Sequence, residues 1–169
     1  MQAAMTEEPT IAPAGELARA FEDHHSLVFG TAYRITGNAA DAEDVLQTIF
    51  LRLLRREQRD RMEDQKSYLR RAAVNVSLDL VRSRRDERAA DLVGIPSGAK
   101  DHDGGELKEA LRRALGRLAP RSAEVFALRF FEGFSNQEIA GMLGMSSVLV
   151  AVIVHRARRQ LQRDLGNYR

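Results

Sequence analysis

Residues 135–150 read SNQEIAGMLGMSSVLV, and this stretch decides the fold of the C-terminal half. Ser135 and Glu138 form the pattern of a capping box, in which the serine hydroxyl accepts from the first turn of a helix and the glutamate reaches back. Ala140, Gly144 and Val150 stand where a helix-turn-helix needs close packing, a left-handed turn and a buried contact. We therefore predict a short helix after Ser135, a turn at Gly144 and a second helix.

The second helix of this pair carries a conflicting pattern. Val148 to Val154 is an unbroken apolar run rich in β-branched residues, which by propensity alone favours a buried strand. Ser146 is suited to cap a helix just before the run, and arginines continue the helical pattern as far as Arg163. We therefore predict a helix here as well.

Apolar residues recur at three- and four-residue steps through much of the remaining chain, as is typical of amphipathic helices. Gly37 is a helix stop, and Asn38 is suited to cap the helix that follows. These patterns predict helices over 15–36, 39–54, 67–88, 107–118 and 120–131.

The stretch 89–106 divides these helices into two groups. It contains four glycines and a proline but no helical stripe, so we interpret it as a flexible linker. Residues 1–14 are expected to form a loose tail and 57–66 a loop. The predicted fold is all-α, with two small helical domains at 15–88 and 107–169, the second a four-helix domain built around the helix-turn-helix.

Composition narrows the function classes. The 169 residues are 44% hydrophobic and 30% charged, which is enough apolar material for a folded core. The absence of cysteine excludes disulfides, cysteine-ligated zinc, iron–sulfur clusters and thiol catalysis. No apolar run approaches the roughly 18 residues of a membrane span and no leader pattern is present, so we expect a cytoplasmic protein without membrane insertion.

Charge is sorted along the chain although the net charge is only +2. Residues 1–51 carry −6, residues 52–88 carry +5, residues 89–106 carry −3 and residues 107–169 carry +6. Clusters of Lys and Arg gain affinity for polyanions by releasing counterions condensed on phosphates. The two basic blocks are thus compatible with two nucleic-acid surfaces, or with two solvated helical faces.

Short motifs recur in a fixed order along the chain: 32–38 (AYRITGN), 41–47 (DAEDVLQ), 50–52 (FLR), 68–69 (YL), Asn75, 78–79 (LD), Arg82, 118–121 (LAPR), 126–129 (FALR), 132–135 (EGFS), 138–140 (EIA) and 155–158 (HRAR). In order and spacing they resemble the extracytoplasmic-function (ECF) sigma factors, small two-domain members of the bacterial sigma-70 family. The resemblance covers about residues 20–165 and favours the nucleic-acid interpretation of the two basic blocks.

The resemblance implies that the first domain, sigma region 2, binds core RNA polymerase and melts and recognises the minus-ten promoter element. On the second predicted helix, an outward-facing set of residues matches the polymerase-docking position: Asp41, Asp44, Gln47, Thr48, Leu51 and Arg52. The expected minus-ten readers are Arg61, Lys66, Tyr68, Arg71, Asn75, Asp79, Arg82, Arg84 and Arg85. Tyr68 stands where the family often has tryptophan and is expected either to pack in the core or to stack on a base.

The second domain, sigma region 4, would read the minus-thirty-five element. The recognition helix departs from the family, since Leu149, Ala151 and Ile153 replace the usual polar residues. We expect small apolar side chains to contact thymine methyl groups, and the arginines to contact phosphates. Alternatively, this apolar face binds a protein such as an anti-sigma factor. The expected DNA contacts are Ser135, Ser146, Ser147, Ala151, Val152, His155, Arg156, Arg158 and Arg159.

The resemblance therefore implies a nucleoid-associated sigma factor whose partners are core RNA polymerase and promoter DNA. Two alternatives are a helix-turn-helix regulator and a sigma mimic that sequesters an anti-sigma factor. An enzyme would have to use Asp41, Glu43 and Asp44 with His24 or His25. Neighbouring histidines point to different sides of a helix, and acids in a first turn usually complement the dipole. We expect no enzymatic activity, no metal and no cofactor.

Overall fold

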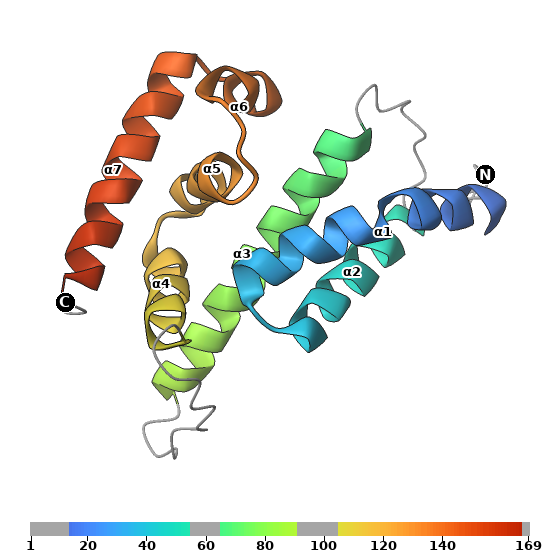
Figure 1. The fold of residues 1–169 in the computed structure, drawn as a ribbon, viewed down its shortest axis with the longest axis horizontal. Coiled ribbons are helices and arrows are strands. Elements are labelled where there is room, and N and C mark those ends of the chain that lie inside the picture. The colour runs from blue at the N-terminus through green and yellow to red at the C-terminus, as the bar shows by residue number, and fades with distance from the viewer. Residues whose placement is uncertain (1–13, 55–64, 91–104, 167–169) are drawn as a thin grey trace, which may run out of the picture.

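The computed structural model describes residues 14–54, 65–90 and 105–166, and all regular structure in these ranges is helical (Figure 1). The predicted helix boundaries differ from those observed by at most two residues. The all-α prediction is therefore confirmed. The helices are α1 (Ala14–Thr36), α2 (Ala39–Leu54), α3 (Gln65–Ala90), α4 (Gly105–Arg117), α5 (Pro120–Phe130), α6 (Asn136–Leu143) and α7 (Ser147–Leu165).

Three predicted segments fall mainly outside the described residues. They are the tail 1–14, the loop 57–66 and the linker 89–106, and only their edges can be assigned. Ala14 belongs to α1, Gln65 and Lys66 open α3, and α3 and α4 take up both ends of the linker.

The turn between α1 and α2 forms as its residues predict. Gly37 adopts a φ of +70°, a left-handed conformation that favours glycine, and its N–H donates to the Tyr33 carbonyl at 2.8 Å. The Asn38 side chain then accepts from the backbone N–H of Asp41 at 3.2 Å. This cap starts α2 immediately after the turn and sets the two helices side by side.

Helices α1, α2 and α3 form the first module. Their apolar stripes meet in one buried cluster, and Tyr68 packs against its edge. Packing of this kind supplies most of the stability of short amphipathic helices. The cluster consists of Val28, Ala32, Ala42, Val45, Ile49, Phe50, Leu69 and Ala73.

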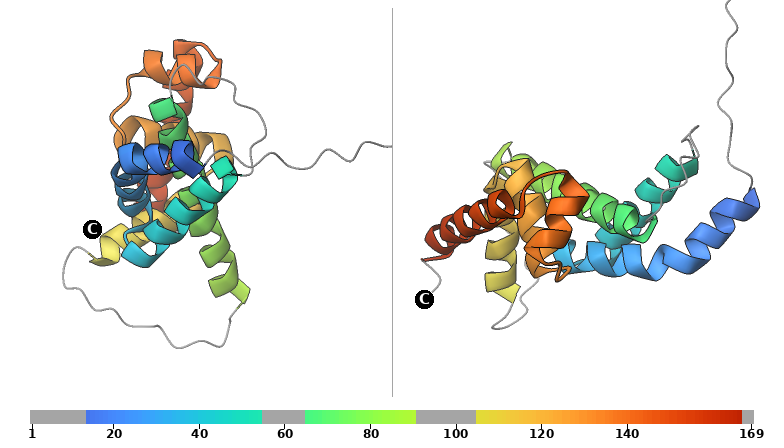
Figure 2. Two further views of the ribbon diagram at one scale, coloured as in Figure 1. Left: turned by 90° about the vertical axis from the view of Figure 1, so that its right-hand side faces the viewer. Right: turned by 90° about the horizontal axis from the view of Figure 1, so that it is seen from above.

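Helices α4 to α7 form the second module, at the opposite end of the molecule from the start of α1 (Figure 2). Helices α6 and α7 bend through 108° at the short break between them. This angle lies within the range of about 90–120° that a helix-turn-helix requires. Val150, Ala157 and Leu161 of α7 are buried against the rest of the module.

The two modules share a core, which the sequence did not predict. Ile35, Val74 and Leu78 of the first module lie in the same buried cluster as Leu115 and Leu128 of the second. The long α3 makes this possible, because it packs against α1 and α2 and also against α4 and α5 (Figure 1).

Polar contacts extend the joint between the modules. Nη1 of Arg85 donates to the carbonyl of the buried Gly116 at 2.6 Å. The guanidinium of Arg112 covers Gly37, in the space that a Cβ atom would occupy. A residue without a side chain at the α1–α2 turn therefore allows α4 to approach closely.

Candidate nucleic-acid interface

The helix-turn-helix is built by the predicted caps. The backbone N–H of Glu138 donates to Oγ of Ser135 at 3.2 Å, and the N–H of Ser135 donates to Oε2 of Glu138 at 2.7 Å. Gly144 then adopts a φ of +63°, and Oγ of Ser146 accepts from the N–H of Leu149 at 3.2 Å. The predicted helix-turn-helix is confirmed, including the helical state of its β-branched run.

Replacing Ser135 with alanine is expected to lower the free energy of unfolding by about 0.5–2 kcal/mol, because the side-chain half of the box is lost. Urea denaturation of the full chain measures this effect. Ser147→Ala, which removes an exposed hydroxyl next to the second cap, is the control and should change stability much less. An equal loss in both variants would contradict the assigned cap.

The same box gives stability a pH dependence. Hydrogen bonds from the backbone N–H and the hydroxyl of Ser135 lower the pKa of Glu138 below its ordinary value of 4.5. A carboxyl whose pKa is depressed on folding contributes stability above its unfolded pKa and loses it as the pH falls through the folded pKa. The stability difference between wild type and Ser135→Ala should therefore shrink below about pH 4.5.

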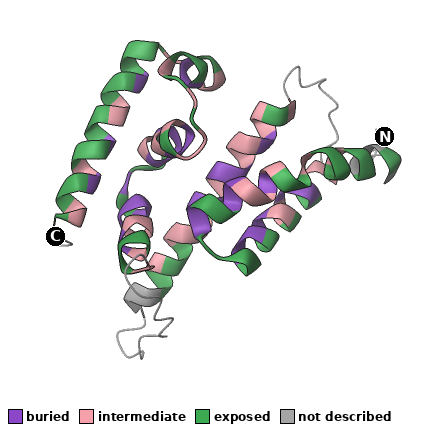
Figure 3. Cartoon of the chain, in the orientation of Figure 1, coloured by how far each residue is buried: buried purple, intermediate pink, exposed green. Residues whose placement is uncertain are grey.

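The outer face of α7 is largely exposed (Figure 3), and the capping residues Ser135 and Ser146 are exposed as well. Its first half is apolar, since Val148 and Leu149 are 72% and 47% exposed and Val152 is 38% exposed. Its second half is cationic. All nine predicted minus-thirty-five contacts are exposed: Ser135, Ser146, Ser147, Ala151, Val152, His155, Arg156, Arg158 and Arg159.

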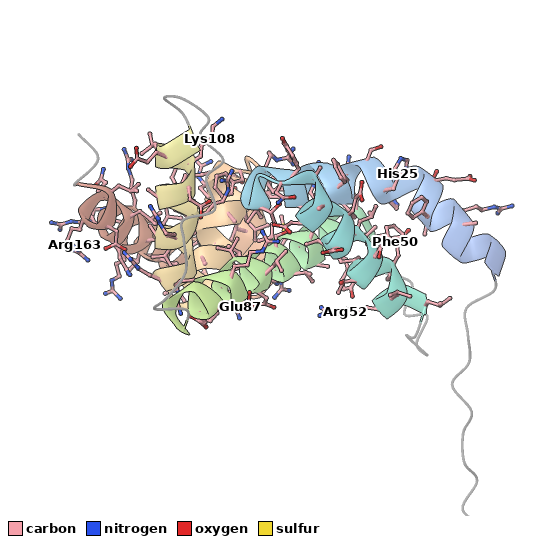
Figure 4. All side chains as sticks on the ribbon, turned by 90° about the horizontal axis from the view of Figure 1, so that it is seen from below. His25, Phe50, Arg52, Glu87, Lys108 and Arg163 are labelled. Atoms are coloured by element: carbon pink, nitrogen blue, oxygen red, sulfur yellow. The ribbon has the colours of Figure 1, made fainter. Side chains whose placement is uncertain are left out.

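The predicted polymerase-docking face of α2 is largely accessible. Asp44, Gln47, Leu51 and Arg52 are exposed and Thr48 is half-buried. Leu51 is 50% exposed although it is a large apolar residue. On the other side of the helix, Phe50 is buried and packs edge-on against Phe21 of α1, whereas Arg52 projects from α2 (Figure 4).

Asp41 does not lie on this face, so that part of the prediction is wrong. It is only 2% exposed, because the C-terminal half of α3 covers the start of α2 and brings Arg84 onto the carboxylate. Burial raises the pKa of Asp41 even though the Arg84 guanidinium opposes that rise. Asp41 thus joins α2 to α3.

The predicted minus-ten readers on α3 divide into two groups. Lys66 and Asp79 are exposed, Nη1 of Arg82 donates to Asp79 at 3.1 Å, and Arg84 pairs with Asp41. Tyr68 is half-buried against the first-module core, which favours packing over base stacking. Arg61 lies outside the described residues.

The second group contacts the second module. Nε of Arg71 donates to Oε1 of Glu124 in α5 at 2.7 Å, and Nδ2 of Asn75 donates to the same oxygen at 3.0 Å. Nη1 of Arg71 also points to the Met142 carbonyl at 3.4 Å, and Arg85 donates to the Gly116 carbonyl.

The sequence interpretation did not foresee that Glu124 and Glu132 are buried acids paired with residues of the first module. The Glu124 side chain is 7% exposed and that of Glu132 is 1% exposed. Glu124 is the one charged residue in the otherwise apolar run Ala123 to Leu128. A lone acid in such a run is a sign of a buried, paired carboxylate. That sign indicates burial but does not identify the partners.

Burial alone would raise the pKa of Glu124. Hydrogen bonds from Arg71 and Asn75, together with the charges of Arg71 and Arg121, outweigh burial and hold the pKa of Glu124 below its ordinary value. The carboxylate is therefore ionised at neutral pH, as its ion pairs with Arg71 and Arg121 require.

Neither a metal site nor a membrane span is found in the described residues. They contain no group of three or more His, Cys, Asp or Glu side chains placed to hold a metal ion. Within the same ranges no single helix is long and apolar enough to cross a membrane, and α6 with α7 reaches that length and composition only as a bent pair.

The fold and these surfaces define a two-module helical protein with an exposed helix-turn-helix. The family model for sigma-70 region 2 matches residues 20–87, and the model for sigma-70 region 4 matches residues 108–161. Both matches coincide with the modules seen here.

Individual proteins similar to this chain are also sigma factors. The RNA polymerase sigma factor CarQ of Myxococcus xanthus is 33% identical over 158 residues, covering 87% of this chain and 90% of the relative. The ECF RNA polymerase sigma factor SigE of Mycolicibacterium smegmatis is 31% identical and covers 86% of this chain, which spans only 60% of that relative's length. The chain belongs to the ECF sigma factors of the sigma-70 family.

A solved structure shares the fold. The sigma factor RpoE of Bartonella quintana, crystallised with the anti-sigma factor NepR, superposes with a TM-score of 0.53 at 20% identity. The match covers 92% of this chain and all of that one. It supports the all-helical arrangement.

Proposed function

We propose that this protein binds core RNA polymerase and directs it to specific promoters. The observation that carries the proposal is the presence, in one chain, of an accessible α2 face in a region 2 module and an exposed recognition helix in a region 4 module. A regulator that acted only through DNA would need the second of these surfaces but not the first.

The exposed face of α2 suits a protein interface. It combines an apolar residue, Leu51, with the polar Gln47 and the charged Asp44 and Arg52. Interfaces that form and dissociate have such mixed composition, with one or two apolar residues supplying much of the binding energy.

The α7 surface suits duplex DNA. Arg156, Arg158 and Arg159 supply phosphate contacts, which position the helix without reading sequence. Ala151 and Val152 are small enough to approach thymine methyl groups in the major groove. The minus-thirty-five preference would then rest on methyl contacts and DNA shape more than on polar base contacts.

The region 2 module would take up the melted minus-ten strand along α3. A cationic groove with pockets for unstacked bases binds single strands, and flipping a base out costs a few kcal/mol. We propose that binding energy supplies this cost, without enzymatic turnover by this chain. The protein would then act at the nucleoid.

In vitro transcription tests the proposal. Purified chain and core polymerase are incubated with genomic promoter fragments, and discrete run-off transcripts that depend on the chain are expected. Binding to duplex DNA without polymerase-dependent transcripts would favour the helix-turn-helix regulator. Absence of both transcripts and duplex DNA binding, with capture of an anti-sigma factor, would favour the sigma mimic. The exposed apolar residues Val148 and Leu149 support this alternative.

The proposed mode of minus-thirty-five recognition gives a prediction. Ala151→Lys places a long donor on the groove face, so selection from random duplexes should yield a changed preferred sequence at one or two positions. A good base contact discriminates by about 1–3 kcal/mol. Gln162→Lys adds the same charge to an exposed position further along α7 and should leave the preference unchanged. An unchanged preference in both variants would contradict a groove-facing Ala151.

A further inference from the structure

A pocket lies where the first four helices meet. Thr36 at the end of α1 and Asp41 in the first turn of α2 line it, together with parts of α3 and α4, which pack against each other (Figure 1). The space among the lining residues measures about 400 Å³, including the part that is open to solvent. A small molecule can therefore reach it directly from water.

The lining of this pocket is rich in arginine. Among the described residues that line it, four carry a guanidinium and two carry a carboxylate, so positive charges exceed negative ones by two. These residues are Arg84 and Arg85 of α3, Arg112 and Arg113 of α4, and the acids Asp41 and Glu109. Such an excess attracts anions and repels cations. The pocket is therefore suited to an anion and not to a metal ion.

The two acids leave donors of these arginines for a ligand. Arg84 pairs with Asp41, and Nη1 of Arg112 lies 3.4 Å from Oε2 of Glu109. A guanidinium has five N–H donors, so one pair does not exhaust it. An anion that enters the pocket can accept hydrogen bonds without displacing either acid.

Two of the guanidiniums are held in place by neighbouring backbone. Nη1 of Arg85 donates to the Gly116 carbonyl at 2.6 Å, and the Arg112 guanidinium lies over Gly37. Arg85 also contacts Asp86, but that acid is 65% exposed, and water screens a pair of this kind. Side chains that are already fixed lose less conformational entropy when they bind a ligand. The pocket is thus partly organised for an anion before one binds.

Phosphate is the anion that this arrangement suits best. Arginine binds phosphate oxygens through paired N–H donors, which adds specificity as well as affinity. A phosphate monoester carries about −1.5 to −2 charges at neutral pH, which matches the excess charge of the lining. Leu80 and Val81 are half-buried parts of the same lining, and they offer apolar contact to the remainder of an organic phosphate.

We propose that this pocket binds the phosphate group of a small phosphorylated molecule, with the arginines of α3 and α4 supplying the donors and the charge. The site goes beyond the proposed function, which gives α4 no ligand. Arg84 and Arg85 are also predicted minus-ten contacts, so a bound phosphate would occupy two side chains that a promoter strand would use. That consequence, unlike the site itself, rests on the proposed function.

Isothermal titration calorimetry of the full chain at fixed salt tests the site with pyrophosphate, ATP and adenosine. Pyrophosphate and ATP are expected to bind at one site per chain, whereas adenosine, which has no phosphate, is not. Similar affinities for pyrophosphate and ATP would identify a site for phosphate alone, and ATP binding tighter by about tenfold or more would identify a nucleotide site. Binding of neither, or adenosine binding as tight as that of ATP, would overturn the proposal.

Arg112→Gln with Arg113→Gln removes two of the four guanidiniums without changing a predicted promoter contact. The affinity for pyrophosphate should fall by at least about tenfold, because hydrogen bonds to a charged group are lost. The matched control is Arg19→Gln with Arg163→Gln, which lowers the net charge equally at exposed positions of α1 and α7. It should change the affinity by less than about twofold. Equal losses in both variants would show general attraction and overturn the site.

A second readout needs no substitution. Phenylglyoxal modifies accessible guanidiniums, and peptide mass spectrometry locates the modified residues. Pyrophosphate at about ten times its Kd should slow the modification of Arg112 and Arg113 by about tenfold. Arg19 and Arg163 should react as before. Unchanged modification of the two α4 arginines would overturn the proposal, and this test stands even if the glutamine variant fails to fold by circular dichroism.

Neither readout uses polymerase or a promoter. Phosphate binding and protection in a chain that supports no transcription would therefore overturn the proposed function and leave the pocket standing. Transcription by a chain that binds neither pyrophosphate nor ATP would overturn the pocket and leave the proposed function standing.

Discussion

Leu51→Asp in α2 is expected to weaken binding to core RNA polymerase by about 30-fold or more, and to abolish transcription at limiting chain concentration. Leu51 is 50% exposed and lies among polar residues on the proposed docking face. An apolar residue at the centre of an interface contributes most when water is excluded around it, and a carboxylate there would be buried without a partner. Titration of labelled chain with core polymerase measures the loss.

Leu107→Asp is the matched control. Leu107 is a leucine of α4 that is 52% exposed, so the substitution and the exposure are the same while the location differs. It should leave polymerase binding within about twofold of wild type, because surface substitutions away from an interface have small effects. An equal loss from both substitutions would show that α2 is not the docking face.

Leu78→Ala is expected to lower the free energy of unfolding by about 2–5 kcal/mol. Leu78 is 1% exposed and lies in the core that the two modules share, so its truncation leaves a cavity bordered by both. Urea denaturation followed by circular dichroism measures the effect. We further expect the unfolding transition to be broader than that of wild type, or split, because the link between the modules is weakened.

Leu69→Ala separates loss of core volume from loss of the joint. Leu69 is fully buried, but it belongs to the cluster of the first module alone. It should cost a similar free energy while the modules remain joined. A loss below about 1 kcal/mol for Leu78→Ala would contradict its place in a tightly packed shared core.

Local patterns in the sequence were sufficient to predict the helices. The caps at Ser135 and Ser146 and the turn at Gly144 depend on residues within a few positions of one another. The run Val148 to Val154 shows how such local order overrides propensity: Ser146 fixes the first turn, and burial of Val150 holds the helix in place.

Contacts between distant segments could not be predicted in this way. Asp41 looked like an ordinary dipole-complementing acid, but Arg84, 43 positions away, lies on it and α3 buries it. Arg71 and Glu124 are 53 positions apart, and Arg34 and Glu132 are 98 apart. Neither pair has a spacing that a helical pattern reveals. The α7 and α2 surfaces were predictable because exposure follows from helical periodicity, whereas a joint depends on how whole helices dock.

The shared core also has a consequence for synthesis. Ile35, Val74 and Leu78 are made before Leu115 and Leu128, the residues that cover them. A ribosome adds about 5–20 residues per second, so the stretch from Leu78 to Leu128 takes several seconds to appear. During that interval the nascent first module exposes apolar side chains to water, and such surfaces are the ones that chaperones shield until the rest of the chain has been made.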